Sequence, residues 1–411
     1  MSSVIMRSDI IGGQKKLKPG RVIILDLFGT ILSDVSNKYE KGIDWLCREI
    51  LTVGTEYAAA KRVAEEYFRA NMQNRTTTHK EASLQKQLEM FRERIGFRDN
   101  FPLSEIEYGF FKASRVTAIE SGLMELLSYL KEKDFSVFVM SNTIFSAETV
   151  KRLLDAHGIG QYFNGVYTSG DCGHRKPGNK FFSYVYKRIR EKVAVKRDEV
   201  IFVGNSLEKD VLGAKRFRFN PIWLSADKCG FGEELADCAR VENLLECKDY
   251  LERNFLSVAG ISKHYSVSDG EGNRIVVYLQ GCDLKCRGCH NQSTWNEFGG
   301  RIMSVRRLVE DVLLRLARAA RNVTISGGEP LTQPKALQTL LTEFGRAGVD
   351  VCLYTGREFE DVSDEVKSKI HYLKTGRFVH TEKTTTKGYY GSANQKFFAK
   401  GANGEWLKKD I

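Results

Sequence analysis

Three cysteines lie within eight residues of one another in the second half of the chain, at Cys282, Cys286 and Cys289. The preceding stretch 274–280 (RIVVYLQ) is predicted to be a strand, so all three thiols fall on the loop that follows it. Three thiolates on one short loop can bind a single soft metal centre. Zinc is the other possibility, but a structural zinc site normally needs a fourth Cys or His at regular spacing. We therefore expect an iron–sulfur cluster with three protein ligands, which leaves one iron open for a cofactor.

A second motif, Gly327-Gly328-Glu329-Pro330, follows the predicted strand 323–326. Glycines let the backbone approach a ligand closely, and Glu329 offers a carboxylate to a cationic group. Alone, this motif would indicate no more than a turn between a strand and a helix. Because it comes one strand–helix unit after the cysteines, it predicts a cofactor pocket beside the cluster.

The first half of the chain carries another set of polar residues, each at or after the end of a predicted strand or on a connecting loop: Asp26, Ser141, Lys176 and Asp210. Doubly wound sheets bind their ligands at the carboxyl ends of their strands, where such residues would meet. An Asp at the end of a strand more often caps the following turn or helix than acts as a nucleophile. The ordered set of four is what predicts a site.

Short β-branched runs alternate with longer amphipathic stretches, which indicates strand–helix units and parallel sheet. A long insert at about 36–120 is rich in helix-forming residues, and its position predicts a cap over the sheet. We expect a tail at 1–20, a first domain at 21–235, a linker of helix and connector without a strand at 236–262, and a second domain at 263–411. The predicted strands are 21–26, 135–141, 165–169, 200–204 and 221–225 in the first half and 274–280, 323–326 and 351–355 in the second, with a helix at 305–319.

Composition limits the class of protein. The length of 411 residues suits two domains, and 42% hydrophobic with 28% charged residues describes a folded globular chain. Neither a membrane-spanning apolar run nor a signal-peptide core is found, so we expect a cytoplasmic protein without a membrane partner. Nine cysteines without an export signal argue against a disulfide framework. The net charge of +11 is scattered and does not predict nucleic-acid binding.

The second half resembles the radical S-adenosylmethionine (SAM) superfamily. The string GCDLKCRGCHNQSTW at 281–295 looks like the activating enzymes of anaerobic ribonucleotide reductase, and YTG at 354–356 and GSANQ at 391–395 are further matches. The resemblance covers about 263–411 and implies a partial (β/α) barrel.

By this resemblance, Cys282, Cys286 and Cys289 ligate a [4Fe–4S] cluster whose fourth iron is chelated by SAM, and 327–330 borders the methionine part of SAM. Reduced flavodoxin or ferredoxin then supplies the electron that cleaves SAM to a 5′-deoxyadenosyl radical. The implied partner is a glycyl radical enzyme.

The first half resembles the haloacid dehalogenase (HAD) superfamily over roughly 20–235, with a Rossmann-like sheet and the insert as its cap. By that resemblance Asp26 is the nucleophile, and Ser141 and Lys176 hold the phosphoryl oxygens. Asp26 and Asp210 would bind Mg²⁺, a hard cation suited to carboxylates.

Two residues depart from the HAD pattern. Phe28 stands where phosphatases of the family have a second Asp as general acid and base, and Asn205 replaces an acidic residue of the last motif. General acid–base help is worth about 10² to 10⁴ in rate. Slow phosphatase activity, different leaving-group chemistry and a phosphate-binding module therefore all remain open.

We interpret the chain as a two-domain α/β enzyme. The first hypothesis is a radical SAM activase that installs a glycyl radical on a partner enzyme. The alternative is a biosynthetic enzyme whose radical domain modifies a small phosphorylated metabolite or nucleotide while the HAD-like domain removes or holds its phosphate. Fusion favours the alternative because it raises the local concentration of a shared intermediate. A third reading makes the first domain a recognition module for a phosphorylated ligand or partner.

Overall fold

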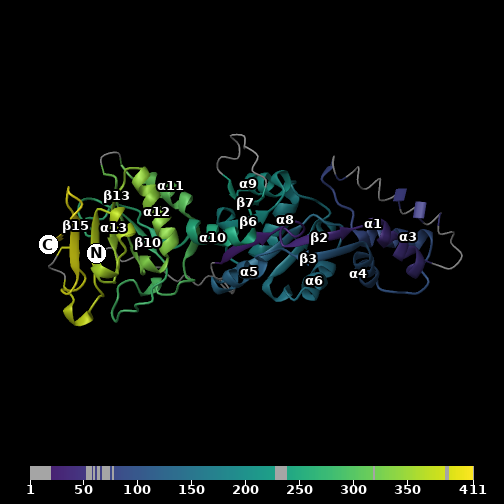
Figure 1. Cartoon of the computed structure of the whole chain (residues 1–411), viewed down its shortest axis with the longest axis horizontal. Helices are drawn as coiled ribbons and strands as arrows, with labels where there is room; N and C mark the ends of the chain where they lie inside the picture. Colours follow the sequence, from purple (N-terminus) through teal and green to yellow (C-terminus); the bar gives the residue numbers. More distant parts are fainter. Residues whose placement is uncertain are drawn as a thin grey trace, which may run out of the picture.

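The computed structural model describes residues 20–51, 58, 61–62, 65–66, 75, 78–226, 238–317, 320–384 and 388–410. The predicted tail lies outside the described residues except for Gly20, as does the predicted end of the first domain at 235. Figure 1 shows two bodies side by side, with the purple-to-teal first half at one end of the molecule and the green-to-yellow second half at the other.

A six-stranded parallel sheet forms the centre of the first body, in the order β5-β4-β1-β6-β7-β8. The sequences RVIIL of β1 and VIFVG of β6 are buried at every position, as expected of parallel strands covered on both faces. The strands are β1 (Arg21–Leu25), β4 (Phe135–Ser141), β5 (Gly165–Thr168), β6 (Val200–Gly204), β7 (Asn220–Leu224) and β8 (Ala239–Val241), and the longer helices are α5 (Leu123–Glu132), α6 (Ala147–Ala156), α8 (Asn179–Arg190) and α10 (Leu244–Asn254).

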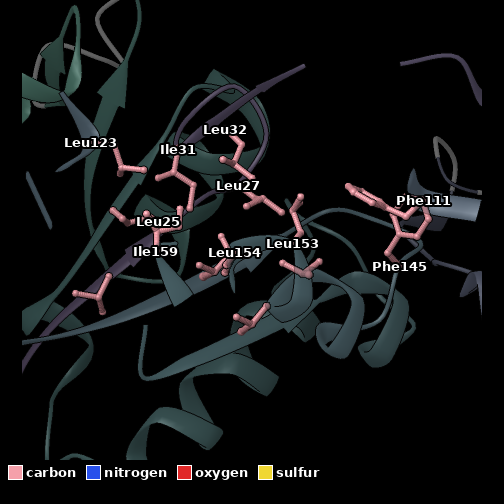
Figure 2. Close-up of a cluster of buried hydrophobic side chains, with 14 of the residues drawn as sticks. Leu25, Leu27, Ile31, Leu32, Phe111, Leu123, Phe145, Leu153, Leu154 and Ile159 are labelled. Carbon is pink, nitrogen blue, oxygen red and sulfur yellow. The ribbon is translucent and has the colours of Figure 1, made fainter. Parts of the chain in front are cut away.

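Alternate residues of β1 enter two different hydrophobic cores. Ile23 and Leu25 belong to the larger cluster, while Val22 and Ile24 belong to the cluster on the other face, as the two-residue period of a strand requires. Figure 2 shows part of the larger cluster, in which Leu25 lies near side chains of α6 such as Leu154. Packing on both faces fixes β1, and therefore the position of Asp26 directly after it.

The insert is a helical cap carried on a two-stranded ribbon. Strands β2 (Leu32–Asn37) and β3 (Arg115–Ile119) pair antiparallel and lead into and out of the cap. The ribbon was not predicted, because its first strand, LSDVSN, is mostly polar and exposed. The described cap helices are α1 (Tyr39–Trp45), a π-helix (Leu46–Ile50), α3 (Leu84–Arg94) and α4 (Leu103–Ser114), which lie at the end of the molecule away from the second body (Figure 1).

The second body is built on an eight-stranded mixed sheet in the order β11-β9-β10-β12-β13-β14-β15-β16. The four central strands, β10, β12, β13 and β14, are parallel to one another, and the strands on both sides pair antiparallel. The α/β fold class is confirmed, with antiparallel strands added to the predicted parallel core. The elements are β9 (Phe255–Ile261), β10 (Ile275–Leu279), β11 (Arg301–Ser304), β12 (Asn322–Gly327), β13 (Asp350–Tyr354), β14 (Tyr372–Thr375), β15 (Lys396–Lys400), β16 (Trp406–Lys409), α11 (Val305–Leu313), α12 (Pro334–Arg346) and α13 (Asp364–Ser368).

The range 236–262, which we expected to lack strands, differs from that prediction. Its described part contains β8 of the first sheet, helix α10, and β9 of the second sheet. Strand β8 has only three residues, too few for a periodic pattern, and β9 begins directly after α10 with no turn residue between them. Helix α10 is therefore the element that separates the two sheets, and it packs against both α5 and α12.

The second body packs against the amino-terminal edge of the first sheet. Arg21, the first residue of β1, donates to the carbonyl of Lys133 at 2.8 Å, to Ser257 Oγ at 2.9 Å, and to the carbonyl of Glu297. Ion pairs of Lys335 with residues of α10 and of Arg301 with Glu199 add to this contact. Asp26 follows the opposite end of the same strand.

Candidate active sites

The cysteine loop is held mainly by its own backbone. Gly281 N donates to the carbonyl of Thr294 at 2.8 Å, and Cys282 N donates to the carbonyl of Trp295 at 3.2 Å. Cys289 N bonds to the carbonyl of Cys286, and Cys289 Sγ accepts from Asn291 N at 3.4 Å. The sequence between the strand and residue 295 thus closes into a compact loop that presents the three thiols.

The three thiols are free and half-buried. Burial raises the pKa of Cys282, while backbone N–H groups of Lys285 and Leu284 lower it. Within the described parts of the chain, no three His, Cys, Asp or Glu side chains converge closely enough to hold one metal ion. A zinc ion needs its sulfur ligands about 2.3 Å from a common point. Three soft thiols with backbone N–H donors beside them are the kind of ligands that an iron–sulfur cluster takes.

The Gly327–Pro330 motif lies directly against the start of the cysteine loop. Gly328 N donates to the carbonyl of Leu279 at 2.9 Å, and Glu329 N donates to the carbonyl of Gly281 at 2.8 Å. A Cβ on Gly328 would lie 2.1 Å from the Gly281 carbonyl oxygen, so the close approach requires glycine. The structure thus brings the two motifs of the second domain together.

The Glu329 carboxylate is already bonded inside the protein. It is 1% exposed and accepts from Thr355 Oγ1 and Gly356 N, both at 2.8 Å, and from Leu331 N at 3.0 Å. Burial raises the pKa of Glu329, and these donors lower it. We expected this carboxylate to face a cationic group of a ligand, but the contacts point to a positioning role, because Glu329 ties the end of β12 to the end of β13.

Two arginines near the cysteine loop were missed by the sequence reasoning. Arg357 forms an ion pair with Asp283, and Arg377 donates to the carbonyl of Leu284 at 2.6 Å. Each arginine is the last residue of a Thr-Gly-Arg tripeptide. The first copy directly follows the tyrosine that ends β13, and the second copy begins at the last residue of β14. This repeat at the carboxyl ends of adjacent strands was the available signal.

In the first domain, the structure brings Asp26, Lys176 and Asp210 together. Lys176 Nζ lies 2.6 Å from Asp26 Oδ1, 2.6 Å from Asp210 Oδ1 and 3.0 Å from the carbonyl of Met140, and all three side chains are buried. Burial raises the pKa of Asp26 to about 6, against the opposing effect of Lys176. Burial lowers the pKa of Lys176, but the two carboxylates outweigh it and raise the pKa overall.

Neighbouring residues position these three groups. Asn142, next to Ser141, bonds the backbone of Lys176 twice, at 2.9 Å through its amide nitrogen and at 2.8 Å through its oxygen. Asp210 Oδ2 accepts from Ser206 N at 2.8 Å. Ser141 ends β4 at the same edge of the sheet and is buried. The role of Asn142 was missed, because its partner is 34 residues away in the sequence.

The pair of carboxylates fits Mg²⁺. Asp26 Oδ1 and Asp210 Oδ1 both lie 2.6 Å from Lys176 Nζ, and both carboxylates are buried. Two carboxylates that converge on one buried point are the hard oxygen ligands this cation prefers.

The two departures from the HAD pattern also have defined surroundings. The Phe28 ring is half-buried and lies under the guanidinium of Arg115, 3.9 Å from the ring centroid. Arg115 also pairs with Asp34 at 3.2 Å, within the ribbon that carries the cap. A Cβ on Gly29 would lie 2.2 Å from Asn205 Nδ2, so Asn205 packs against the loop after Asp26. The position of the second Asp is thus occupied by an apolar ring beneath a cation.

Comparisons with known proteins agree with this division. The family model described as haloacid dehalogenase-like hydrolase matches residues 21–218, and the model described as 4Fe-4S single cluster domain matches residues 268–398. Among solved structures, the HAD phosphatase from Thermococcus onnurineus covers 56% of this chain and 97% of its own, with 19% identity and a TM-score of 0.38, values too low to support a conclusion. The chain combines a HAD-like hydrolase domain with a radical SAM-type domain.

Curated relatives match the second domain. The anaerobic ribonucleoside-triphosphate reductase-activating protein of Enterobacteria phage T4 is 30% identical over 144 residues, which is 34% of this chain and 90% of the relative. The pyruvate formate-lyase-activating enzyme of Clostridium pasteurianum is 41% identical over 91 residues, which is 21% of this chain and 38% of that enzyme. Through its second domain, the chain belongs to the same family as the anaerobic ribonucleoside-triphosphate reductase-activating protein.

Within the described parts of the chain, no helix combines the length and the apolar character needed to cross a membrane.

Proposed function

We propose that the second domain is a radical SAM activase that generates a glycyl radical on a partner enzyme of the anaerobic ribonucleotide reductase type. The observation that carries the proposal is the backbone contact between the cysteine loop and the Gly327–Pro330 motif, in a domain that matches nine-tenths of the phage T4 activating protein. When bound, a [4Fe–4S] cluster and SAM supply the radical that abstracts a hydrogen atom.

The chain's own residues have separate tasks in this proposal. Cys282, Cys286 and Cys289 hold the cluster. Gly328 allows the two loops to touch, and the buried Glu329 fixes the loop by its bonds to Thr355 and Gly356. The electron donor would be a reduced flavodoxin or ferredoxin.

We propose that the first domain binds a phosphorylated ligand and hydrolyses it slowly. Asp26 is placed to act as the nucleophile, and Lys176 is placed to neutralise charge on the phosphoryl oxygens. Mg²⁺ held by Asp26 and Asp210 would supply further charge stabilisation. Phe28 cannot transfer a proton, which is the reason to expect slow turnover. Arg115, stacked on Phe28, adds positive charge beside the site.

The biosynthetic alternative requires an intermediate that passes between the two sites. The second domain contacts Arg21 at one end of β1, whereas Asp26 follows the other end, about 16 Å away along an extended strand. The HAD-like site and its cap therefore face away from the interface with the second domain. This arrangement supports two separate substrates.

The test for the second domain measures 5′-deoxyadenosine formed by anaerobically reconstituted full-length protein with SAM and a strong reductant. Host extract is separated by size, each fraction is added, and Cys289→Ala is the blank. Stimulation by the macromolecular fraction alone supports the activase. Stimulation by the small-molecule filtrate overturns it in favour of the biosynthetic alternative.

The test for the first domain is hydrolysis of p-nitrophenyl phosphate with Mg²⁺. We expect slow turnover that is abolished in Asp26→Asn and unchanged in Glu208→Gln, whose exposed side chain lies two residues from Asp210. Turnover that survives in Asp26→Asn would contradict the assigned nucleophile.

A further inference from the structure

A cavity of about 230 Å³ lies between the two domains. The first domain contributes Arg21 and the aromatic rings of Tyr129 and Phe135, and the second contributes the start of α12. Gln280, which directly precedes the cysteine loop, also lines it. Neither proposed active site uses this space.

The wall of the cavity contains a buried charge without a counter-ion. Arg21 is 6% exposed, and its three hydrogen bonds go to neutral acceptors, namely the carbonyls of Lys133 and Glu297 and the hydroxyl of Ser257. Among the described residues, Arg21 forms no ion pair, and its buried Nε has no hydrogen-bond partner. An arginine cannot shed its charge by losing a proton, and an unpaired buried charge is strongly unfavourable. An anion in the cavity would supply the missing counter-charge.

The start of α12 adds a second anion-binding feature to the same wall. The helix begins at Pro334 without a side-chain cap. The Gln333 side chain is used elsewhere, because it accepts from Ser257 N at 2.7 Å and donates to the carbonyls of Gln280 and Ser257. The N–H groups of Lys335 and Ala336 therefore have no acceptor within the helix. The free N–H groups and the dipole of a 13-residue helix favour a negative charge there.

The other charged residues that line the cavity do not already supply an anion to Arg21. The Lys335 ammonium pairs with Asp249 and Glu252 on α10, and Arg253 also pairs with Asp249, so Glu252 in the cavity wall already has a cationic partner. Burial lowers the pKa of Arg21, and the carboxylates of Glu297 and Asp134 oppose that shift from a distance. Glu297 also lines the cavity, but neither carboxylate forms an ion pair with Arg21 among the described residues. Lys133 also lines the cavity, but its ammonium is paired with Glu132 at 3.0 Å.

The size and the apolar walls limit the ligand. Tyr129, Phe135 and Phe255 line the cavity with rings. Its volume is larger than the roughly 150 Å³ of a cavity that admits benzene and smaller than the roughly 300 to 1,000 Å³ of sites for drug-sized ligands. One ring-sized body with one anionic group matches these dimensions.

We propose that this interdomain cavity is a binding site for a small organic anion, a carboxylate or phosphate monoester on a flat apolar body, held between Arg21 and the amino terminus of α12. The anion accepts hydrogen bonds from the Lys335 and Ala336 N–H groups, and the ring packs against the aromatic wall. Because Arg21 bonds to Ser257 and Glu297 of the second domain, the bound ligand touches both domains at their contact.

The first experiment titrates benzoate and phenyl phosphate into the full chain by calorimetry, in an Asp26→Asn background that prevents hydrolysis. Arg21→Gln is expected to weaken binding at least tenfold. The matched control is Arg301→Gln, which removes an interdomain ion pair outside the cavity and should change affinity less than twofold. Any phenyl phosphate binding that survives Arg21→Gln belongs to the HAD-like site. No saturable binding of either probe, or equal affinity in Arg21→Gln, overturns the proposal.

A second measurement does not depend on the folding of Arg21→Gln. Hydrogen–deuterium exchange of the Asp26→Asn chain with benzoate should slow at the amides of Lys335 and Ala336 and in the peptide 255–258. Protection confined to 26–30 and 141–143 would place the anion in the HAD-like site and refute the interdomain site.

Discussion

The two candidate active sites are assembled in opposite ways. In the first domain, the Lys176 ammonium lies 2.6 Å from carboxylate oxygens of both Asp26 and Asp210 in a buried triad. In the second domain, the cysteine loop is shaped by backbone bonds, while its three thiols stay half-buried and free. The first site is thus organised by the groups that do the chemistry. The second site is organised by backbone hydrogen bonds around the thiols, and the thiols themselves are available for a metal centre.

This difference predicts how each site responds to substitution. Removal of Lys176 leaves two buried carboxylates without a counter-charge, so it should damage stability as well as activity. Removal of the Cys286 thiol takes away a ligand but no hydrogen bond seen among the described residues of the loop, so it should abolish function and spare the fold.

The largest expected effect is that of Cys286→Ala. Loss of one of three ligands should abolish cluster binding, and reductive SAM cleavage should fall to background, while the unfolding transition stays the same. Iron content and 5′-deoxyadenosine are the measurements. Cys172→Ala, which changes a half-buried thiol outside the loop, should retain both. Zinc retained at stoichiometric level in Cys286→Ala, with iron lost, would contradict the cluster assignment.

Next is Lys176→Met, which leaves two buried carboxylates without a counter-ion. Breaking a buried pair typically costs about 3–5 kcal/mol, and we expect a loss of that size in the free energy of unfolding of the first domain by urea titration. Lys180→Met changes an exposed lysine nearby and should cost less than about 0.5 kcal/mol. Equal stability of the two variants would show that the triad is not coupled as described.

Phe28→Asp tests whether the missing general acid limits hydrolysis. A proton-transferring group at this position should raise phosphatase turnover by about 10²-fold, the lower end of such contributions. Phe28→Leu, which changes shape without adding a proton donor, should give no increase. If Phe28→Asp stays at the wild-type rate while it folds normally, the first domain is better described as a phosphate-binding module.

A smaller effect is expected for Glu329→Gln in the second domain. The amide keeps the shape but loses the charge that accepts from Thr355 and Gly356, and bonds to charged groups are worth about 1.5–3 kcal/mol. We expect a loss in this range together with weaker SAM binding. Glu310→Gln, which removes an exposed helix ion pair, should cost about 0.5 kcal/mol or less. Normal stability with weak SAM binding would instead indicate direct contact with the cofactor.

The last prediction is a pH dependence of the triad in metal-free protein. The pKa of Asp26 in the folded state, about 6, is above its ordinary value of 3.8, so the native state holds this proton more tightly. Its contribution to stability is therefore present below about pH 4 and is lost as the pH rises to about 6. Urea unfolding across this window should show wild type losing stability relative to Asp26→Asn. A constant difference between them would contradict the raised pKa.

The sequence predicted those features that depend on neighbouring residues in the chain. The fully buried runs of β1 and β6 gave their strands to within a residue, and the cysteines and the Gly327–Pro330 motif are local patterns. Strand β16 was missed, because WLKK is short and charged. The roles of Asn142 and Arg21 were missed for another reason. Their partners are distant in sequence, so only the folded arrangement of the chain defines them.

Strand β1 places the domain joint at the edge of the sheet opposite Asp26 and the cap ribbon. That edge is the one on which doubly wound folds do not bind ligands. In evolutionary terms, a gene fusion at this edge preserves what each ancestor needed, because the ribbon that carries the cap and the end of β1 that precedes Asp26 lie away from the contact with the second domain. Selection could therefore join the two modules first and add communication through their contact surface afterwards.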